Sequence, residues 1–158
     1  MRATKRTRAG TALTNLILDL FKVNNRMLTS GDKLVAGLGL TSARWQVLGT
    51  IATSDRPQPV AWIARDMGAN RQNVQRIIND LASEGLVALA TNPHHRRAQL
   101  VILTDKGKNA FEAAMRLQAP WVNGLSEGLK VKDIETTHGV LMALRLKLEG
   151  NEDVEEQT

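Results

Sequence analysis

The chain has 158 residues, a length that suits one domain or one domain with helical extensions. Hydrophobic residues make up 42% of it but aromatic residues only 3%, so its core must be aliphatic. The absence of cysteine excludes disulfides, thiolate zinc sites, thiol nucleophiles and thiol redox sensing. A formal net charge of +5 favours polyanionic partners through long-range electrostatics.

Charge is concentrated at the two ends of the chain. Residues 1–10 carry basic side chains and no acid, and residues 149–158 carry acidic side chains and no base. We therefore expect a basic disordered arm over 1–10 and an acidic disordered tail over 149–158. Residues 12–18 imitate a signal peptide, but Asn15 and Asp19 interrupt the apolar pattern. With no segment apolar enough to cross a bilayer, we expect a cytoplasmic protein without a membrane partner.

Helical spacing of apolar residues predicts a long amphipathic helix over 11–38, ended by Gly37 and Gly39. A second helix is expected from Ser42 to Thr53, because the hydroxyl of Thr41 can cap it. Residues 54–59 contain two prolines and are predicted to form a loop.

Two short helices then follow with a tight turn between them. The first is predicted over 60–67 and stops at Gly68, and the second runs over 71–84 with Asn70 as its cap. This is the pattern of a helix-turn-helix. Strands over 86–91 and 98–103, joined by the polar turn 92–97, predict a hairpin wing directly behind it.

The C-terminal part is predicted to be helical. Thr104 caps a helix that begins at Asp105 and runs to about Ala119, where Pro120 should bend or end it. A last helix is expected over 133–148, and its apolar side chains are spaced alternately three and four residues apart, which suits packing against a partner helix. These seam positions are Ile134, Thr137, Leu141, Leu144 and Leu148.

The order helix, helix, helix-turn-helix, wing, helix, helix resembles the MarR family of bacterial transcription regulators. Three segments carry the resemblance: TSARWQVLGTIA in the second helix, VAWIARDMGANRQNVQRIINDLASEGLV in the helix-turn-helix, and TNPHHRRAQLVILTDKG in the wing and the helix behind it. The implied fold is mainly α with a small β-hairpin wing. A winged helix-turn-helix over 41–104 would lie between dimerisation regions over 11–38 and 105–148.

The resemblance also implies partners. It implies a homodimer on double-stranded DNA with a near-palindromic site, each recognition helix in a major groove and each wing in the adjacent minor groove. It further implies a small anionic or aromatic effector, and no cofactor. The chain departs from the family at His95, where the wing usually carries an aspartate that orients the following arginine.

The predicted recognition helix has one apolar and one polar face. Val74, Ile77, Ile78 and Leu81 fall on the apolar face, and the other face has no acid before Asp80. Arg, Gln and Asn can make paired hydrogen bonds to base edges, and arginine at a wing fits a narrow minor groove. The expected DNA contacts are Asn70, Arg71, Gln72, Asn73, Gln75 and Arg76 in the helix-turn-helix, and His95, Arg96 and Arg97 in the wing.

Other kinds of site find less support. The family pocket suggests Phe21, Arg44, Trp45 and Met115 for an effector, although aromatic residues in so small a set more often anchor a core. No metal site is expected, because His94 and His95 are adjacent on a hairpin and point in different directions. The chain contains no catalytic motif, so it is not expected to be an enzyme.

These features predict a sequence-specific DNA-binding regulator, a homodimeric repressor that a small-molecule effector releases. Two alternatives remain: a winged-helix module for protein interactions, and a nucleoid-type DNA binder without sequence preference. The polar recognition face argues against the first, because interaction surfaces usually expose apolar anchors.

Overall fold

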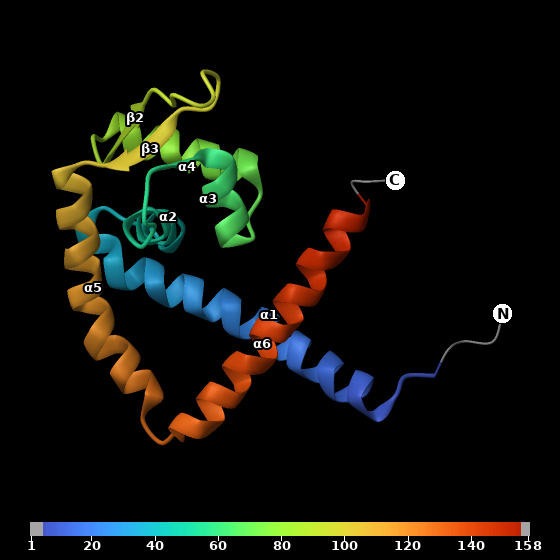
Figure 1. Ribbon diagram of the computed structural model, residues 1–158. Helices are drawn as coiled ribbons and strands as arrows, with labels where there is room; N and C mark the ends of the chain where they lie inside the picture. The colour runs from blue at the N-terminus through green and yellow to red at the C-terminus, as the bar shows by residue number, and fades with distance from the viewer. Residues whose placement is uncertain (1–4, 156–158) are drawn as a thin grey trace. The chain divides into compact units, whose positions relative to one another are not determined.

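The computed structural model describes residues 5–155, with side chains for residues 5–150. It is mostly helical with a small antiparallel sheet, which confirms the predicted fold class (Figure 1). The chain forms two compact units, Met1–Ala119 and Pro120–Thr158. Its elements are α1 (Arg8–Val35), the 3-10 helix η1 (Ala36–Leu38), α2 (Ser42–Ala52), β1 (Gln58–Pro59), α3 (Val60–Met67), α4 (Arg71–Ser83), β2 (Val87–Ala90), β3 (Leu100–Leu103), α5 (Asp105–Ser126) and α6 (Val131–Glu155).

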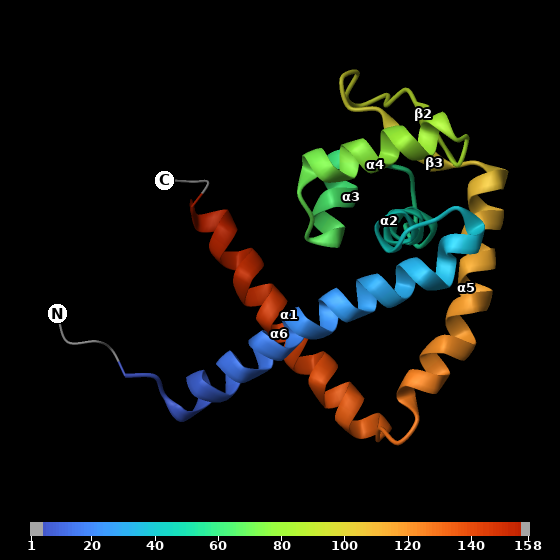
Figure 2. The same cartoon turned by 180° about the vertical axis from the view of Figure 1, so that it is seen from behind.

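The core of the first unit is built mainly from α2, the helix-turn-helix and the sheet, with contributions from α1 and α5. The buried hydrophobic side chains of the described residues are all Val, Leu, Ile or Ala, which confirms the predicted aliphatic core. Leu48 of α2 is fully buried together with Ile63 of α3, Ile78 of α4 and Val101 of β3. Figures 1 and 2 show α2 seen end-on, with α3, α4 and the strands around it.

The sheet contains one strand more than the sequence predicts. Its order is β1-β3-β2, and β1 pairs antiparallel with β3 through Gln58 opposite Val101 and Pro59 opposite Leu100. Residues 54–59 were predicted to be a loop because they contain Pro57 and Pro59. Proline is compatible with an edge strand, where its missing amide is not needed, and β1 lies at an edge.

Helix α1 begins earlier than predicted and is closely joined to α2. Thr7 accepts a hydrogen bond from the amide of Gly10 at 3.0 Å, so the helix starts at Arg8 and the expected disordered arm over 1–10 is wrong for residues 8–10. Ser42 at the start of α2 donates its hydroxyl to the Leu28 carbonyl at 2.7 Å. A Cβ at Gly31 would lie 2.5 Å from the Ser42 hydroxyl oxygen, so glycine makes room for this contact.

The C-terminal helices are longer than predicted. Helix α5 continues through Pro120 to Ser126, so the proline does not end it. Helix α6 continues to Glu155, which makes the predicted disordered tail wrong over 149–155; residues 156–158 lie outside the described part. Glutamate favours helix, and Arg145 pairs with Glu149 four residues on at 3.4 Å. Among the described residues, no helix has an apolar stretch long enough to span a bilayer.

Candidate nucleic-acid interface

The start of α4 is held by the residue predicted to cap it. Helix α3 ends at Gly68, which has a φ of 60° and allows the tight turn. The Asn70 side chain then accepts hydrogen bonds from the amides of Gln72 at 2.9 Å and Asn73 at 3.3 Å. This cap fixes the first turn of α4, which carries three of the predicted base contacts.

The two faces of α4 divide as the spacing predicts. Val74, Ile78 and Leu81 are buried, and Ile77 is half-buried against them. The predicted contacts Arg71, Gln72, Asn73 and Arg76 are exposed, as is the cap Asn70, whereas Gln75 is half-buried. Gln75 donates its amide to the Asn79 side chain at 3.0 Å, which orders the two amides on the polar face.

The arginines of this region are electrostatically available. Among the described residues, the structure gives no ion pair to Arg71, Arg76, Arg96 or Arg97. Arg44 and Arg145, by contrast, each pair with a glutamate. A polyanion approaching α4 and the wing therefore meets guanidinium groups that need not give up a carboxylate partner.

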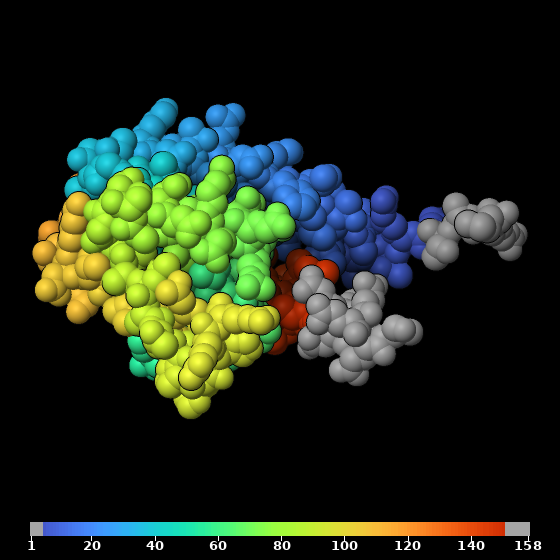
Figure 3. All heavy atoms as spheres, turned by 90° about the horizontal axis from the view of Figure 1, so that it is seen from above, coloured from blue at the N-terminus to red at the C-terminus, as the bar shows by residue number. Residues whose placement is uncertain are grey.

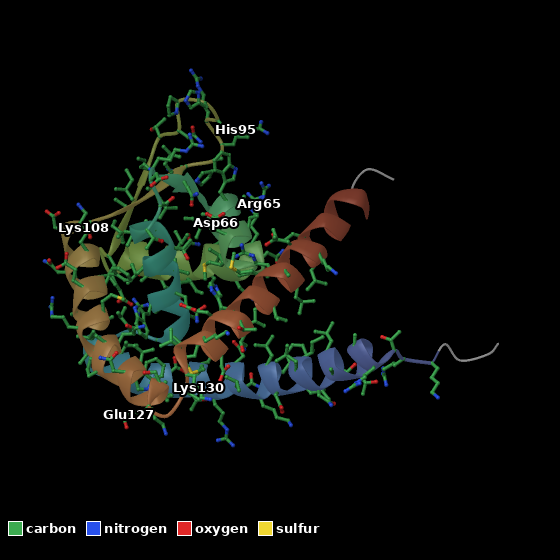
Figure 4. The ribbon with its side chains drawn as sticks, turned by 60° about the horizontal axis from the view of Figure 1, so that its bottom comes forward. Arg65, Asp66, His95, Lys108, Glu127 and Lys130 are labelled. Carbon is green, nitrogen blue, oxygen red and sulfur yellow. The ribbon has the colours of Figure 1, made fainter. Side chains whose placement is uncertain are left out.

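The wing turn is shaped by a residue that the sequence analysis did not single out. Asn92 is buried, and its side-chain oxygen accepts from the His94 amide at 3.0 Å. The amide of Ala98 donates to the His95 carbonyl at 3.0 Å and closes the tip. The side chains of His94, His95, Arg96 and Arg97 are all exposed, and Figure 4 shows His95 pointing outward at the wing. An asparagine followed by proline was the available signal for this turn.

The helix-turn-helix and the wing lie on one face of the first unit. Seen from above, residues of α3 and α4, in green, adjoin those of the wing, in yellow, and together they form a continuous surface (Figure 3). All nine predicted DNA-contacting residues belong to this region of the chain, although they come from separate elements.

The predicted effector residues differ in their surroundings. Phe21 and Met115 are 63% and 39% exposed. Trp45 packs against the core, and Arg44 donates to the Glu84 carboxylate and to the Gly39 carbonyl.

A cavity of about 470 Å³ lies elsewhere, between the end of α2, the loop before β1, β3 and the start of α5. It lies beside Phe111, Lys108 and Glu112, and none of the four predicted effector residues lines it. In the described part of the chain, no three His, Asp or Glu side chains gather closely enough to hold a metal ion.

Two substitutions at Asn70 separate capping from DNA binding. Asn70→Ala should lower the free energy of unfolding by about 1 kcal/mol, because two amides of α4 lose their acceptor. Asn70→Asp keeps the acceptor, so thermal unfolding should stay close to wild type while DNA affinity falls by about fivefold or more through repulsion of phosphate. Wild-type DNA affinity in Asn70→Asp would show that Asn70 does not face the DNA.

Comparison with known proteins agrees with this geometry. A MarR family model matches residues 38–98, which contain the helix-turn-helix and the wing turn. An uncharacterized protein of Mycobacterium tuberculosis is 34% identical over 139 residues, covering 87% of this chain and 96% of that protein. The transcriptional activatory protein BadR of Rhodopseudomonas palustris is 30% identical over 99 residues, covering 61% of this chain and 57% of BadR.

Comparison with solved structures also finds transcriptional regulators. A MarR family transcriptional regulator from Streptomyces coelicolor is 26% identical, with a TM-score of 0.74 over 89% of this chain and 97% of that one. The repressor CouR bound to a 23-mer DNA duplex is 23% identical, with a TM-score of 0.74 over 89% of this chain and 99% of CouR. CouR of Rhodococcus jostii bound to p-coumaroyl-CoA is 20% identical, with a TM-score of 0.71 over 79% of this chain and 87% of CouR. The chain belongs to the MarR family of DNA-binding transcriptional regulators.

Proposed function

We propose that two copies of this chain bind a near-palindromic site in double-stranded DNA and repress transcription by covering promoter elements. The observation that carries the proposal is the polar face of α4, which is exposed, has no acid before Asp80, and presents arginines without ion pairs among the described residues. Such a face suits the major groove, where paired donors and acceptors distinguish all four base pairs.

Within this proposal the residues have different roles. Arg71, Gln72 and Asn73 stand at the N-terminal end of α4 and contact base edges, as the first turn of a recognition helix does. Arg76, one turn later, holds a phosphate, and Gln75 stays with Asn79 on the same face. Arg97 and its neighbours His95 and Arg96 enter the adjacent minor groove.

The partner proposed for α1 and α6, the dimerisation helices, is a second copy of the chain. Helices α1 and α6 expose large apolar side chains in numbers unusual for a chain that stands alone. Two recognition helices held about one helical turn apart, roughly 34–36 Å, match two half-sites of a palindrome. The exposed apolar residues of these helices are Leu18, Leu20, Phe21, Val23, Met27 and Leu28 in α1, and Val131, Ile134, Val140, Met142, Leu146 and Leu148 in α6.

We further propose release by a small anionic or aromatic effector, with Phe21, Arg44, Trp45 and Met115 as its contacts. Support comes from CouR, a repressor that binds DNA in one structure and p-coumaroyl-CoA in another. BadR is named an activator, so related chains include both regulatory outcomes. Arg44 also pairs with Glu84 at the end of α4, so an anion at this guanidinium competes with a contact to the recognition helix.

The test is a titration of alanine variants on a duplex that the wild-type protein selects from a random pool. Arg71→Ala should weaken binding to that duplex by about 1–3 kcal/mol per subunit and relax discrimination at one position of each half-site. Arg76→Ala should weaken all duplexes alike and reduce the salt slope by about one phosphate contact per subunit.

Lys108→Ala is the matched control for loss of a positive charge. Lys108 lies at the start of α5, well apart from His95 of the wing, and its side chain is 61% exposed. Equal losses in Arg71→Ala and Lys108→Ala would indicate a DNA binder without sequence preference. Wild-type affinity in all three variants would point to a protein-interaction module.

A further inference from the structure

The last turn of α4 ends in a backbone arrangement that leaves carbonyls open to other elements. Gly85 has a φ of 74°, its amide donates to the Ala82 carbonyl at 3.0 Å, and the Leu86 amide donates to the Leu81 carbonyl at 2.9 Å. This pairing closes the helix as a Schellman motif. The carbonyl oxygens of Glu84, Gly85 and Leu86 can then accept hydrogen bonds from donors outside the helix.

Two side chains from the start of α5 bind these carbonyls. Lys106 donates its ammonium to the Glu84 carbonyl at 2.8 Å. The Thr104 hydroxyl lies 2.7 Å from the Gly85 carbonyl oxygen and 3.1 Å from that of Leu86, so its single proton serves one or the other. The same hydroxyl accepts from the Gly107 amide at 3.0 Å, which makes Thr104 both the cap of α5 and a tie to α4.

A third side chain reaches the same turn from α2. Arg44 donates one guanidinium nitrogen to the Glu84 carboxylate and the other to the Gly39 carbonyl at 2.9 Å. Its side chain is only 17% exposed, so solvent screens this pair less than the other ion pairs of the described chain. The end of the recognition helix is thereby joined to α2 on one side and to α5 on the other.

We propose that Arg44, Thr104 and Lys106, called here the α4 anchor residues, are positioning residues for DNA readout. They set the direction in which α4 projects from the unit, and so determine where its first turn meets the bases. The proposal rests on the proposed DNA readout by α4 and adds residues that touch no DNA. A positive charge and hydrogen-bond donors near a helix C-terminus also interact favourably with the negative end of the helix dipole, which stabilises this attachment.

The length of α4 gives these contacts leverage. Thirteen helical residues span roughly 20 Å, so a tilt of about 5° at one end moves the other end by about 1.7 Å. A shift of that size breaks hydrogen bonds to base edges, whose donor and acceptor atoms must lie within a few tenths of an ångström of their best distance. Contacts to phosphate by mobile arginine side chains tolerate it. Loss of an anchor residue should therefore lower specific binding more than non-specific binding.

The test compares Lys106→Met with Lys108→Met in the full chain, on the selected duplex and on random duplex DNA. Each substitution removes one positive charge from the first turn of α5, but within the described chain Lys108 pairs only with Asp105, at 3.8 Å. Lys106→Met should lower affinity for the selected duplex by about fivefold to tenfold more than Lys108→Met does, with equal affinity for random DNA. Lys106→Arg, which can still reach the carbonyl, should restore the preference.

Glu84→Gln gives an independent check because it alters charge in the opposite sense. It replaces the carboxylate partner of Arg44 with an uncharged amide, which weakens the pair, and makes the protein more positive, so electrostatics alone would strengthen DNA binding. The proposal expects weaker binding to the selected duplex and stronger binding to random DNA.

An unchanged ratio of the two affinities in Lys106→Met and Glu84→Gln, with wild type selective, would overturn the positioning role. Parallel loss of both affinities together with a lower melting temperature would overturn it as well. A wild type that selects no site would instead show that the proposed function is wrong.

Discussion

Gly107→Ala is expected to lower the free energy of unfolding by about 3 kcal/mol, a loss typical of forced overpacking in a buried site. Gly107 is buried in the first turn of α5. A Cβ built there would lie 1.9 Å from the Leu86 carbonyl oxygen and 3.2 Å from a methyl of Leu103. The first clash is with backbone, so no side chain can rotate to relieve it, and α5 would have to separate from the end of α4.

Gly124→Ala is the matched control in the same helix. The space around a Cβ at Gly124 is open to 4 Å within the described chain, so alanine should raise stability by about 0.5–1 kcal/mol through its helix propensity. Urea unfolding of both variants measures the difference. Equal stability of Gly107→Ala and wild type would show that α5 does not approach Leu86 as closely as the structure places it.

Ile134→Glu in α6 is expected to dissociate the proposed dimer and to reduce affinity for the selected duplex by about 10²–10⁴-fold, because joined recognition helices bind with high effective concentration. Ile134 is 44% exposed and occupies the predicted seam. A carboxylate there would be desolvated against the apolar side chains of a second copy without a partner charge.

Thr136→Glu controls for the added charge, because Thr136 lies two residues away, outside the seam. Its hydroxyl donates to the Lys132 carbonyl of its own helix at 2.8 Å. Light scattering gives the mass in solution, and titration gives the DNA affinity. A monomeric wild type, or an Ile134→Glu variant that keeps its mass and its DNA affinity, would contradict the dimer.

Local residue chemistry predicted the elements around the proposed DNA-binding face well. Helix α3 has its predicted bounds because Gly68 stops it, and Asn70 and Thr104 cap the following helices as expected. Each of these features depends on residues within a few positions of one another. The polar face of α4 could be predicted for the same reason, since the helical repeat alone separates it from Val74 and Ile78.

Some missed features depend on contacts distant in sequence, whereas the early start of α1 depends on the nearby cap at Thr7. Strand β1 exists because β3, forty residues on, supplies its partner, and nothing near Pro59 indicates that. Pro120 would end an isolated helix, yet α5 passes through it. In the sequence, the segment LTDKG supported the family resemblance through its residue types, without a physical reason for them. The structure adds the physical reason, since Thr104, Lys106 and Gly107 each meet the backbone of residues 84–86.

The most direct test of the account is selection of duplexes from a random pool by the wild-type protein at a fixed, near-physiological salt concentration. The account predicts a two-fold symmetric site with half-sites about one helical turn apart, bound at least about a thousandfold more tightly than random DNA. Emergence of no common site, with weak binding of equal strength to all sequences, would contradict sequence readout by Arg71, Gln72 and Asn73.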